Sequence, residues 1–114
     1  MSSDLALIKD KNIQTPEDLV FKALGDRRRR LILDLLKQAP MNTGAICDAL
    51  PELDRCTVMQ HLGVLERADL IFTKREGKCR INYLNVAPLI AIQERWLGGF
   101  KTSALKGLSN LAKL

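Results

Sequence analysis

The sequence has neither a long apolar run nor a set of paired cysteines. No run approaches the roughly 20 residues that a helix needs to cross a bilayer, and the N-terminal stretch has neither a basic start nor a long apolar centre. The three cysteines, Cys47, Cys56 and Cys79, form no CxxC pair, which favours reduced thiols over disulfides. We therefore expect a cytoplasmic protein with no membrane partner.

Residues suited to catalysis or metal binding are also scarce. His61 is the single histidine, no glycine-rich phosphate loop follows an expected strand, and the sequence shows no pair of carboxylates in a shared pocket. Cys47 stands alone in its segment, so it cannot form a thiolate cage for a soft metal. We expect no enzyme activity, no bound metal and no cofactor.

Charged residues are common, and lysines and arginines outnumber aspartates and glutamates. The 114 residues carry a net charge of +5, which permits a polyanionic partner but does not prove one. One cationic cluster is "RRRR" at 27–30 and the other is "KREGKCR" at 74–80. The first begins a helix, where the helix dipole disfavours cations. Asp26 and the spacing to Asp34 offer local partners for Arg29 and Arg30, and a phosphate contact is the weaker alternative for the two preceding arginines, 27 and 28.

Apolar residues recur at helical spacing in four segments ahead of residue 68. Thr15 and Pro16 can open the first, which ends at Gly25, and Asp26 can cap the second, which ends at Ala39. These boundaries predict two helices within the first 40 residues.

A third, short helix is predicted for "TGAICDAL" at 43–50, and Asp54 can cap a fourth. Val58, Leu62 and Leu65 form the expected buried stripe of this fourth helix. Two short helices joined by a tight link of about four residues are typical of a helix-turn-helix unit, in which the second helix can enter a DNA groove.

From Leu70 the apolar period changes to alternation around Gly77, which predicts antiparallel strands at about 70–75 and 79–84. A last helical region begins near Pro88, and glycines 98 and 99 break or kink it. The predicted fold is mainly α with a small β-hairpin, a winged helix-turn-helix in the order ααααββα(α). We expect an N-terminal arm over 1–14, the winged domain over 15–97 and a helical extension over 98–114.

The predicted fourth helix has a polar face opposite its apolar stripe. Arginine suits guanine, glutamine suits adenine and a threonine methyl can contact thymine. A plain amphipathic helix with a solvated polar face is the alternative. His61 is expected to be half-buried and structural, with a direct DNA contact as the alternative. The candidate DNA-binding residues of this helix are Arg55, Cys56, Thr57, Met59, Gln60 and His61.

The predicted hairpin concentrates Lys74, Arg75, Lys78 and Arg80. Their mutual repulsion brings no stability, and a DNA backbone or a narrow minor groove would relieve it. A solvated surface is the alternative for such a cluster. A cationic wing beside a helix with suitable side chains nevertheless favours double-stranded DNA as the partner.

Three segments together resemble the ArsR-type winged-helix repressors. "FKALGDRRRRLILDLL" is similar to their second-helix entry, "TVMQHLGVLERADLI" to their recognition helix and "KREGKCRINYLN" to their wing. The resemblance covers roughly residues 15–97. It implies a homodimer on a palindromic operator and release by an effector, which the sequence does not identify. No known metal site of the family can be assembled, and Arg27 and Gly63 replace a proline and a lysine of many relatives.

The first helix and the last helical region carry more apolar surface than one small chain can bury. We predict that they form the dimer interface. Cys56 beside Arg55 is a candidate redox switch, with an inert small side chain as the alternative. A protein-interaction module without sequence-specific DNA binding is the competing function. The predicted interface residues are Leu19, Leu89, Ile92, Trp96, Leu105 and Leu108.

Overall fold

The structure is a computed structural model that describes residues 14–100. Five helices and three strands follow one another in this part of the chain. In chain order they are α2 (Pro16–Leu24), α3 (Arg27–Gln38), β1 (Met41–Asn42), α4 (Thr43–Ala49), α5 (Arg55–Arg67), β2 (Ile71–Glu76), β3 (Cys79–Leu84) and α6 (Ala87–Leu97). The predicted winged helix-turn-helix fold is confirmed, with β1 as an addition.

Short polar side chains fix where the helices begin. Thr15 caps α2 in a capping box, because its hydroxyl accepts from the Asp18 N–H and the Asp18 carboxylate accepts from the Thr15 N–H. Asp26 accepts from the N–H of Arg28 at the start of α3, and Asp54 accepts from the N–H of Thr57 at the start of α5. These three caps confirm the sequence prediction.

The hairpin belongs to a three-stranded antiparallel sheet in the order β1-β3-β2. Asn82 on β3 lies opposite Met41 on β1 and is 2% exposed. Its amide Nδ2 donates to the Met41 carbonyl at 3.1 Å and to the Thr43 hydroxyl at 3.3 Å. A buried, satisfied amide therefore ties the base of the hairpin to β1 and to the start of α4.

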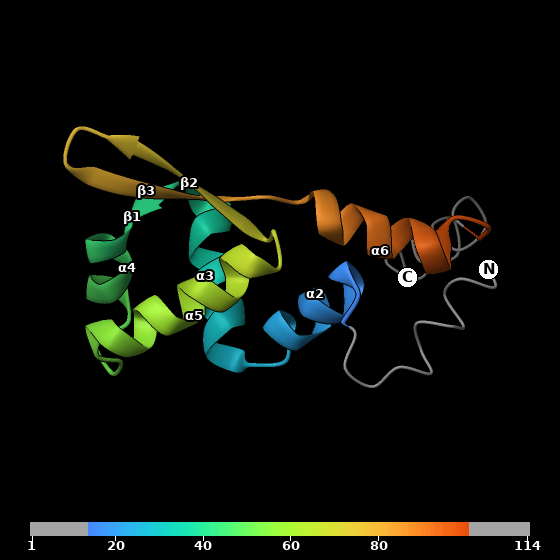
Figure 1. The fold of residues 1–114 in the computed structure, drawn as a ribbon, viewed down its shortest axis with the longest axis horizontal. Coiled ribbons are helices and arrows are strands. Elements are labelled where there is room, and N and C mark those ends of the chain that lie inside the picture. Colours follow the sequence, from blue (N-terminus) through green and yellow to red (C-terminus); the bar gives the residue numbers. More distant parts are fainter. Residues whose placement is uncertain (1–13, 101–114) are drawn as a thin grey trace, which may run out of the picture.

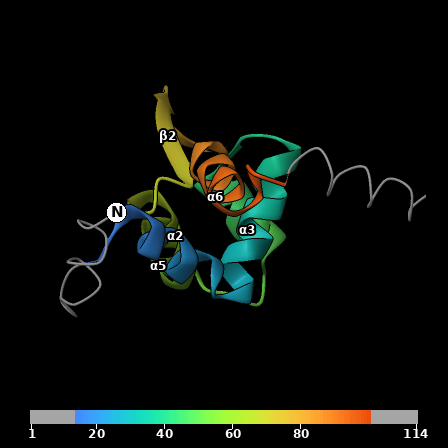
Figure 2. The same cartoon turned by 90° about the vertical axis from the view of Figure 1, so that its right-hand side faces the viewer.

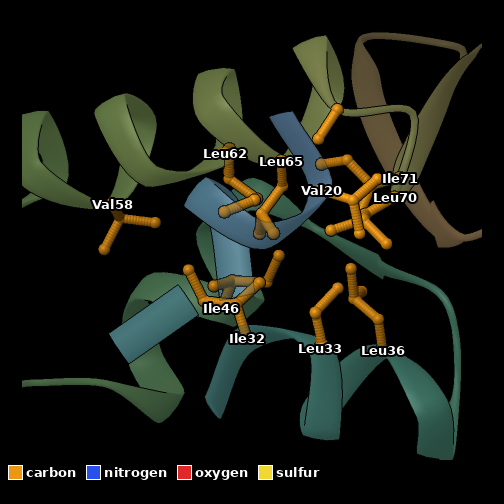
Figure 3. Packing of buried hydrophobic residues seen from close by; sticks show 12 residues of the cluster. Val20, Ile32, Leu33, Leu36, Ile46, Val58, Leu62, Leu65, Leu70 and Ile71 are labelled. Carbon is orange, nitrogen blue, oxygen red and sulfur yellow. The ribbon is translucent and has the colours of Figure 1, made fainter. Parts of the chain in front are cut away.

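The hydrophobic core lies between the helices and the first residue of the hairpin (Figure 3). The predicted stripe of α5 is confirmed, because Val58, Leu62 and Leu65 are all buried. The remaining members come from α2, α3, α4, the segment between α5 and β2, and the first residue of β2, and they are Val20, Ala23, Ile32, Leu33, Leu36, Ile46, Ala68, Leu70 and Ile71. This packing fixes α5 with one face inward and the other outward.

The elements divide the molecule into two ends (Figure 1). The beginning of α5 and the turn of the β2–β3 hairpin lie at one end, while α2 and α6 lie at the other. Seen from the α6 end, the hairpin projects beyond the bundle of helices (Figure 2). The end with the beginning of α5 and the hairpin turn is called the cationic end below. The end with α2 and α6 is called the apolar end.

Candidate nucleic-acid interface

The outward face of α5 carries four of the six residues that the sequence predicts for DNA contact. Arg55, Cys56, Met59 and Gln60 are exposed, and the Met59 side chain is 47% exposed. Thr57 is partly buried next to its capping contact with Asp54. The first two turns of α5 therefore present one guanidinium, one amide and two sulfur-containing side chains to the surroundings, which is where a groove-binding helix contacts bases.

His61 does not belong to this outward face. Its side chain is buried, and its Nδ1 lies 3.3 Å from the Nη1 of Arg29 on α3. Burial lowers the pKa of this imidazole below its ordinary value, so the ring is neutral at pH 7. The inward position favours the structural role over the DNA contact for this residue.

The two faces of the hairpin carry different cations. Arg75 lies directly opposite Arg80, so both side chains occupy one face, whereas Lys74 occupies the other. The Arg80 Nη2 lies 3.6 Å from the Glu66 carboxylate of α5, and its Nε donates to the Thr73 hydroxyl. The face with Arg75 and Arg80 is therefore the one turned toward α5.

The opposite face of the hairpin is aromatic. Phe72 and Tyr83 stack with ring centroids 5.1 Å apart, and the Lys74 Nζ lies 5.6 Å from the Tyr83 centroid. The Tyr83 hydroxyl donates to Glu76. The cation–π contact holds Lys74 over these rings, while Lys78 is exposed in the turn beside Gly77, whose φ of 62° is a left-handed conformation that suits glycine.

A hollow joins α5 to the α5-facing side of the hairpin. Met59, Gly63 and Glu66 line it from the helix, and Thr73 and Arg80 line it from the strands. The outer face of α5 and the cationic face of the hairpin are thus neighbouring parts of one surface. A DNA duplex that contacts one is brought within reach of the other.

The arginine run 27–30 finds most of its partners inside the chain. Arg28 pairs with Asp26, with 3.1 Å between Nη2 and Oδ2. Arg29 donates to the Lys22 and Ala23 carbonyls, and its Nη1 lies 4.0 Å from the Asp26 carboxylate. Arg30 donates to the carbonyl at position 24, so the predicted pairing of Arg30 with the acid four residues later is wrong. The carbonyl end of α2 offsets the unfavourable charge at the start of α3.

The apolar end exposes large side chains that one chain leaves partly uncovered. Phe21 on α2 and Trp96 on α6 are 46% and 52% exposed, with ring centroids 5.9 Å apart. Arg95 binds Glu17 with 2.8 Å between Nη1 and Oε2, which ties α6 to α2. The predicted interface includes Trp96 but not Phe21, because helical spacing places Phe21 beside a buried stripe and does not show how much of its ring is exposed.

The other predicted interface residues have different surroundings. Leu19, Leu89 and Ile92 are partly buried and pack against the core, and Leu105 and Leu108 lie outside the described residues. Further exposed apolar residues in or next to α6, which the predicted interface does not include, are Val86, Ile90, Leu97 and Phe100.

Two further observations concern other kinds of site. Within residues 14–100, no helix is both long and apolar enough to cross a membrane. The same residues contain no group of three or more His, Cys, Asp or Glu side chains placed to hold a metal ion. Cys56 is exposed in the first turn of α5, so its thiol is accessible to solvent.

Known proteins are similar to this chain in sequence and in fold. Residues 24–71 match the family model described as a helix-turn-helix domain. The uncharacterized HTH-type transcriptional regulator YuzN of Bacillus subtilis is 37% identical over 71% of this chain and 95% of its own length. The transcriptional repressor SdpR of Bacillus subtilis is 37% identical over 61% of this chain and 77% of its own length.

A solved structure shows a similar arrangement of elements. The crystal structure of the ArsR family transcriptional regulator RHA00566 covers 76% of this chain and 93% of its own with a TM-score of 0.67 and 25% identity. The match therefore extends from the helix-turn-helix unit to most of the described fold.

Proposed function

Since this chain belongs to the ArsR-type winged helix-turn-helix family and is a DNA-binding transcriptional regulator, we propose that it acts as a dimeric repressor on a palindromic operator. The main support for the proposal is that the outer face of α5 and the cationic face of the hairpin form one continuous surface, joined by the Arg80–Glu66 ion pair and the hollow between them. The relative SdpR is named a transcriptional repressor, and that name supports repression as the outcome of binding.

The α5 residues and the hairpin residues have separate roles in this proposal. In this proposal the major groove receives the first two turns of α5, whose outer face contacts base edges. The contacting residues are Arg55, Thr57, Met59 and Gln60. The hairpin cations bind phosphates or the minor groove, because a cluster of positive charges is attracted to the negative DNA backbone. These cations are Lys74, Arg75, Lys78 and Arg80, all of them exposed.

Two copies related by a two-fold axis would present two such surfaces. Phe21 and Trp96 at the apolar end supply the side chains that a second copy would cover. Pairing there leaves both cationic ends free to contact DNA (Figure 1). In this proposal the bound sequence is an inverted repeat whose half-sites are spaced by about one helical turn, roughly 10 base pairs, or a multiple of it.

A protein-interaction module is the competing class, and its mark would be an apolar outer face on α5. Met59 is the exposed large apolar side chain on that face, and it is flanked by Arg55, Cys56 and Gln60. A single methionine among polar neighbours suits contact with base edges better than an apolar protein surface.

Two substitutions separate base contact from backbone contact. We expect Gln60→Ala to lose about 1–3 kcal/mol of discrimination at one base pair of the operator and little affinity for random duplex DNA. We expect Lys78→Ala to weaken all duplexes and to reduce the salt slope by about 1. The measurement is fluorescence anisotropy on operator variants and random DNA at several salt concentrations.

Lys22→Ala is the matched control, because it removes one exposed cation from α2, away from the proposed surface. The control should leave affinity and salt slope near those of the unmodified chain. Equal loss on every sequence for Gln60→Ala would refute its assignment to bases. Failure of the unmodified chain to bind any duplex would refute the proposed function.

A further inference from the structure

One guanidinium contacts three helices near the beginning of α3. Arg29 on α3 donates from Nε to the Ala23 carbonyl at 2.8 Å and from Nη2 to the Lys22 carbonyl at 2.9 Å, both at the end of α2. Its Nη1 lies 3.3 Å from Nδ1 of His61 on α5. The Arg29 side chain is 15% exposed and His61 is 7% exposed. A contact almost closed to solvent therefore links α5 to α2 and α3, in addition to the apolar packing of α5.

The chemistry of this contact fixes the protonation state of the ring. A guanidinium can only donate, so His61 Nδ1 must accept, and the ring is neutral with its hydrogen on Nε2. The Nε2 atom is buried and has no hydrogen-bond partner within the described part of the chain. A proton on Nδ1 would remove the acceptor and place one cation against another, with no partner on the far side of the ring.

The charged groups that act on His61 all come from the start of α3. Burial is the largest cause that lowers its pKa, the Asp26 carboxylate opposes this, and the Arg28 and Arg29 cations add to it. From α2, the backbone carbonyls at positions 22 and 23 are engaged by Arg29. The local charges thus leave the neutral ring as the form that suits the folded contact.

We propose that the Arg29–His61 contact positions α5 for DNA binding, and that a proton added to His61 breaks this contact and weakens binding. The proposal rests on the proposed function, since it concerns the same helix. Gln60 is next to His61 in the chain, and Thr57 lies one turn earlier on α5. A shift of the α5 backbone at His61 therefore moves two of the side chains assigned to bases. His61 acts here as a positioning residue, without touching DNA.

The sign of the pH effect distinguishes this role from a DNA contact. His61 is the sole histidine, and no other side-chain type has an ordinary pKa between pH 5.5 and 7.5. A histidine on the DNA surface would gain positive charge as the pH falls and tighten binding to phosphates. The buried Arg29–His61 contact predicts the opposite, which is weaker binding at the lower pH.

The first test measures DNA affinity of the full chain at pH 7.5 and 5.5 on a duplex selected for binding and on a random duplex. We expect the affinity of the unmodified chain for the selected duplex to fall by about three- to tenfold at pH 5.5, because a protonated ring can no longer accept from Arg29. His61→Gln keeps a polar side chain that does not titrate in this range, so its affinity should change by less than about twofold.

The second test needs neither DNA nor a variant. The imidazole of His61 gives the single histidine signal in an NMR titration, and its midpoint should lie below the ordinary pKa of about 6.5. Backbone amide shifts in α5 and at the end of α2 should move with the same midpoint. Unfolding free energy should decline as the pH falls below 6.5, because the unfolded chain then binds a proton that the folded chain resists.

Three outcomes would overturn the inference. They are equal or tighter binding at pH 5.5, the same loss in His61→Gln as in the unmodified chain, or a His61 titration that leaves the α5 amides unmoved. Absence of binding to any duplex at pH 7.5 would instead refute the proposed function, and the NMR titration would still decide whether the Arg29–His61 contact is proton-sensitive. Circular dichroism of His61→Gln confirms that the variant is folded.

Discussion

The cationic end and the apolar end of the molecule expose opposite kinds of side chain. Arg55 and Lys78 are exposed at the cationic end, where they gain nothing from one another. Phe21 and Trp96 are exposed at the apolar end, where contact with water is unfavourable. The two ends therefore suit different partners: clustered cations suit a polyanion, and exposed apolar side chains suit another apolar surface. A dimer on DNA would supply both partners.

The largest expected effect comes from charging the apolar end. Trp96→Glu places a carboxylate where the proposed dimer buries an indole, so we expect monomers at micromolar concentration. Affinity for a two-half-site operator should fall by about 100-fold or more, because linked half-sites gain affinities of that order from effective concentration. Analytical ultracentrifugation and anisotropy measure the two effects.

Ala91→Glu is the matched control, because it adds the same charge to an exposed position on another side of α6. The control should remain dimeric. Monomeric behaviour of the unmodified chain under the same conditions would contradict the role given to the apolar end.

The next effect compares the two faces of the hairpin within the cationic end. Arg75 shares the α5-facing side with Arg80, whereas Lys74 lies over Phe72 and Tyr83 on the other side. We expect Arg75→Ala to reduce the salt slope by about 1 and to weaken all duplexes. Lys74→Ala should have a smaller effect on both quantities. An effect of Lys74→Ala that equals or exceeds that of Arg75→Ala would mean that DNA lies along the aromatic face.

A third prediction concerns how the cationic end is attached to the rest of the fold. Asn82 holds β1 and α4 through its buried amide, so Asn82→Ala should lower the free energy of unfolding by about 1–3 kcal/mol. Urea denaturation measures this loss. Gln93→Ala, at an exposed position on α6, is the control and should change stability little. A neutral Asn82→Ala would show that the apolar contacts suffice to hold the hairpin.

The smallest effect concerns Gly63, in the hollow between α5 and the hairpin. A Cβ there would lie 3.5 Å from Nη1 of Arg67, an ordinary contact, so alanine fits the folded chain. We expect Gly63→Ala to raise the unfolding free energy by up to about 1 kcal/mol, because glycine is a poor helix former. Weaker DNA binding by this more stable variant would indicate that the glycine allows close approach to the groove.

Much of the fold could be predicted because its signals are local. The caps Thr15, Asp26 and Asp54 mark helix starts, and the α5 stripe repeats at helical spacing. The two-residue strand β1 was missed, since Met41 and Asn42 are too few to show alternation and their partners lie about 40 residues later. Pairing between distant segments leaves little trace in a short sequence window.

For the candidate site, the sequence predicts which α5 side chains face outward but not the contacts between distant residues. The outward side chains of α5 followed from the position of the apolar stripe, whereas the inward contact of His61 depends on Arg29, which is 32 residues earlier. The division of the hairpin cations depends on the strand register, in which Arg75 pairs with Arg80. A shift of one residue would reverse the faces, so composition alone could not assign Lys74 to the aromatic side.

Selection of bound duplexes from a random pool by the full chain tests whether two copies of α5 bind one DNA site. The proposed dimer predicts enrichment of an inverted repeat whose half-sites are centred about 10 base pairs or a multiple of that distance apart. It also predicts that Gln60→Ala relaxes one symmetric position of that repeat. A pool without sequence enrichment, or with a single asymmetric site, would contradict a dimer that places two copies of α5 in the DNA grooves.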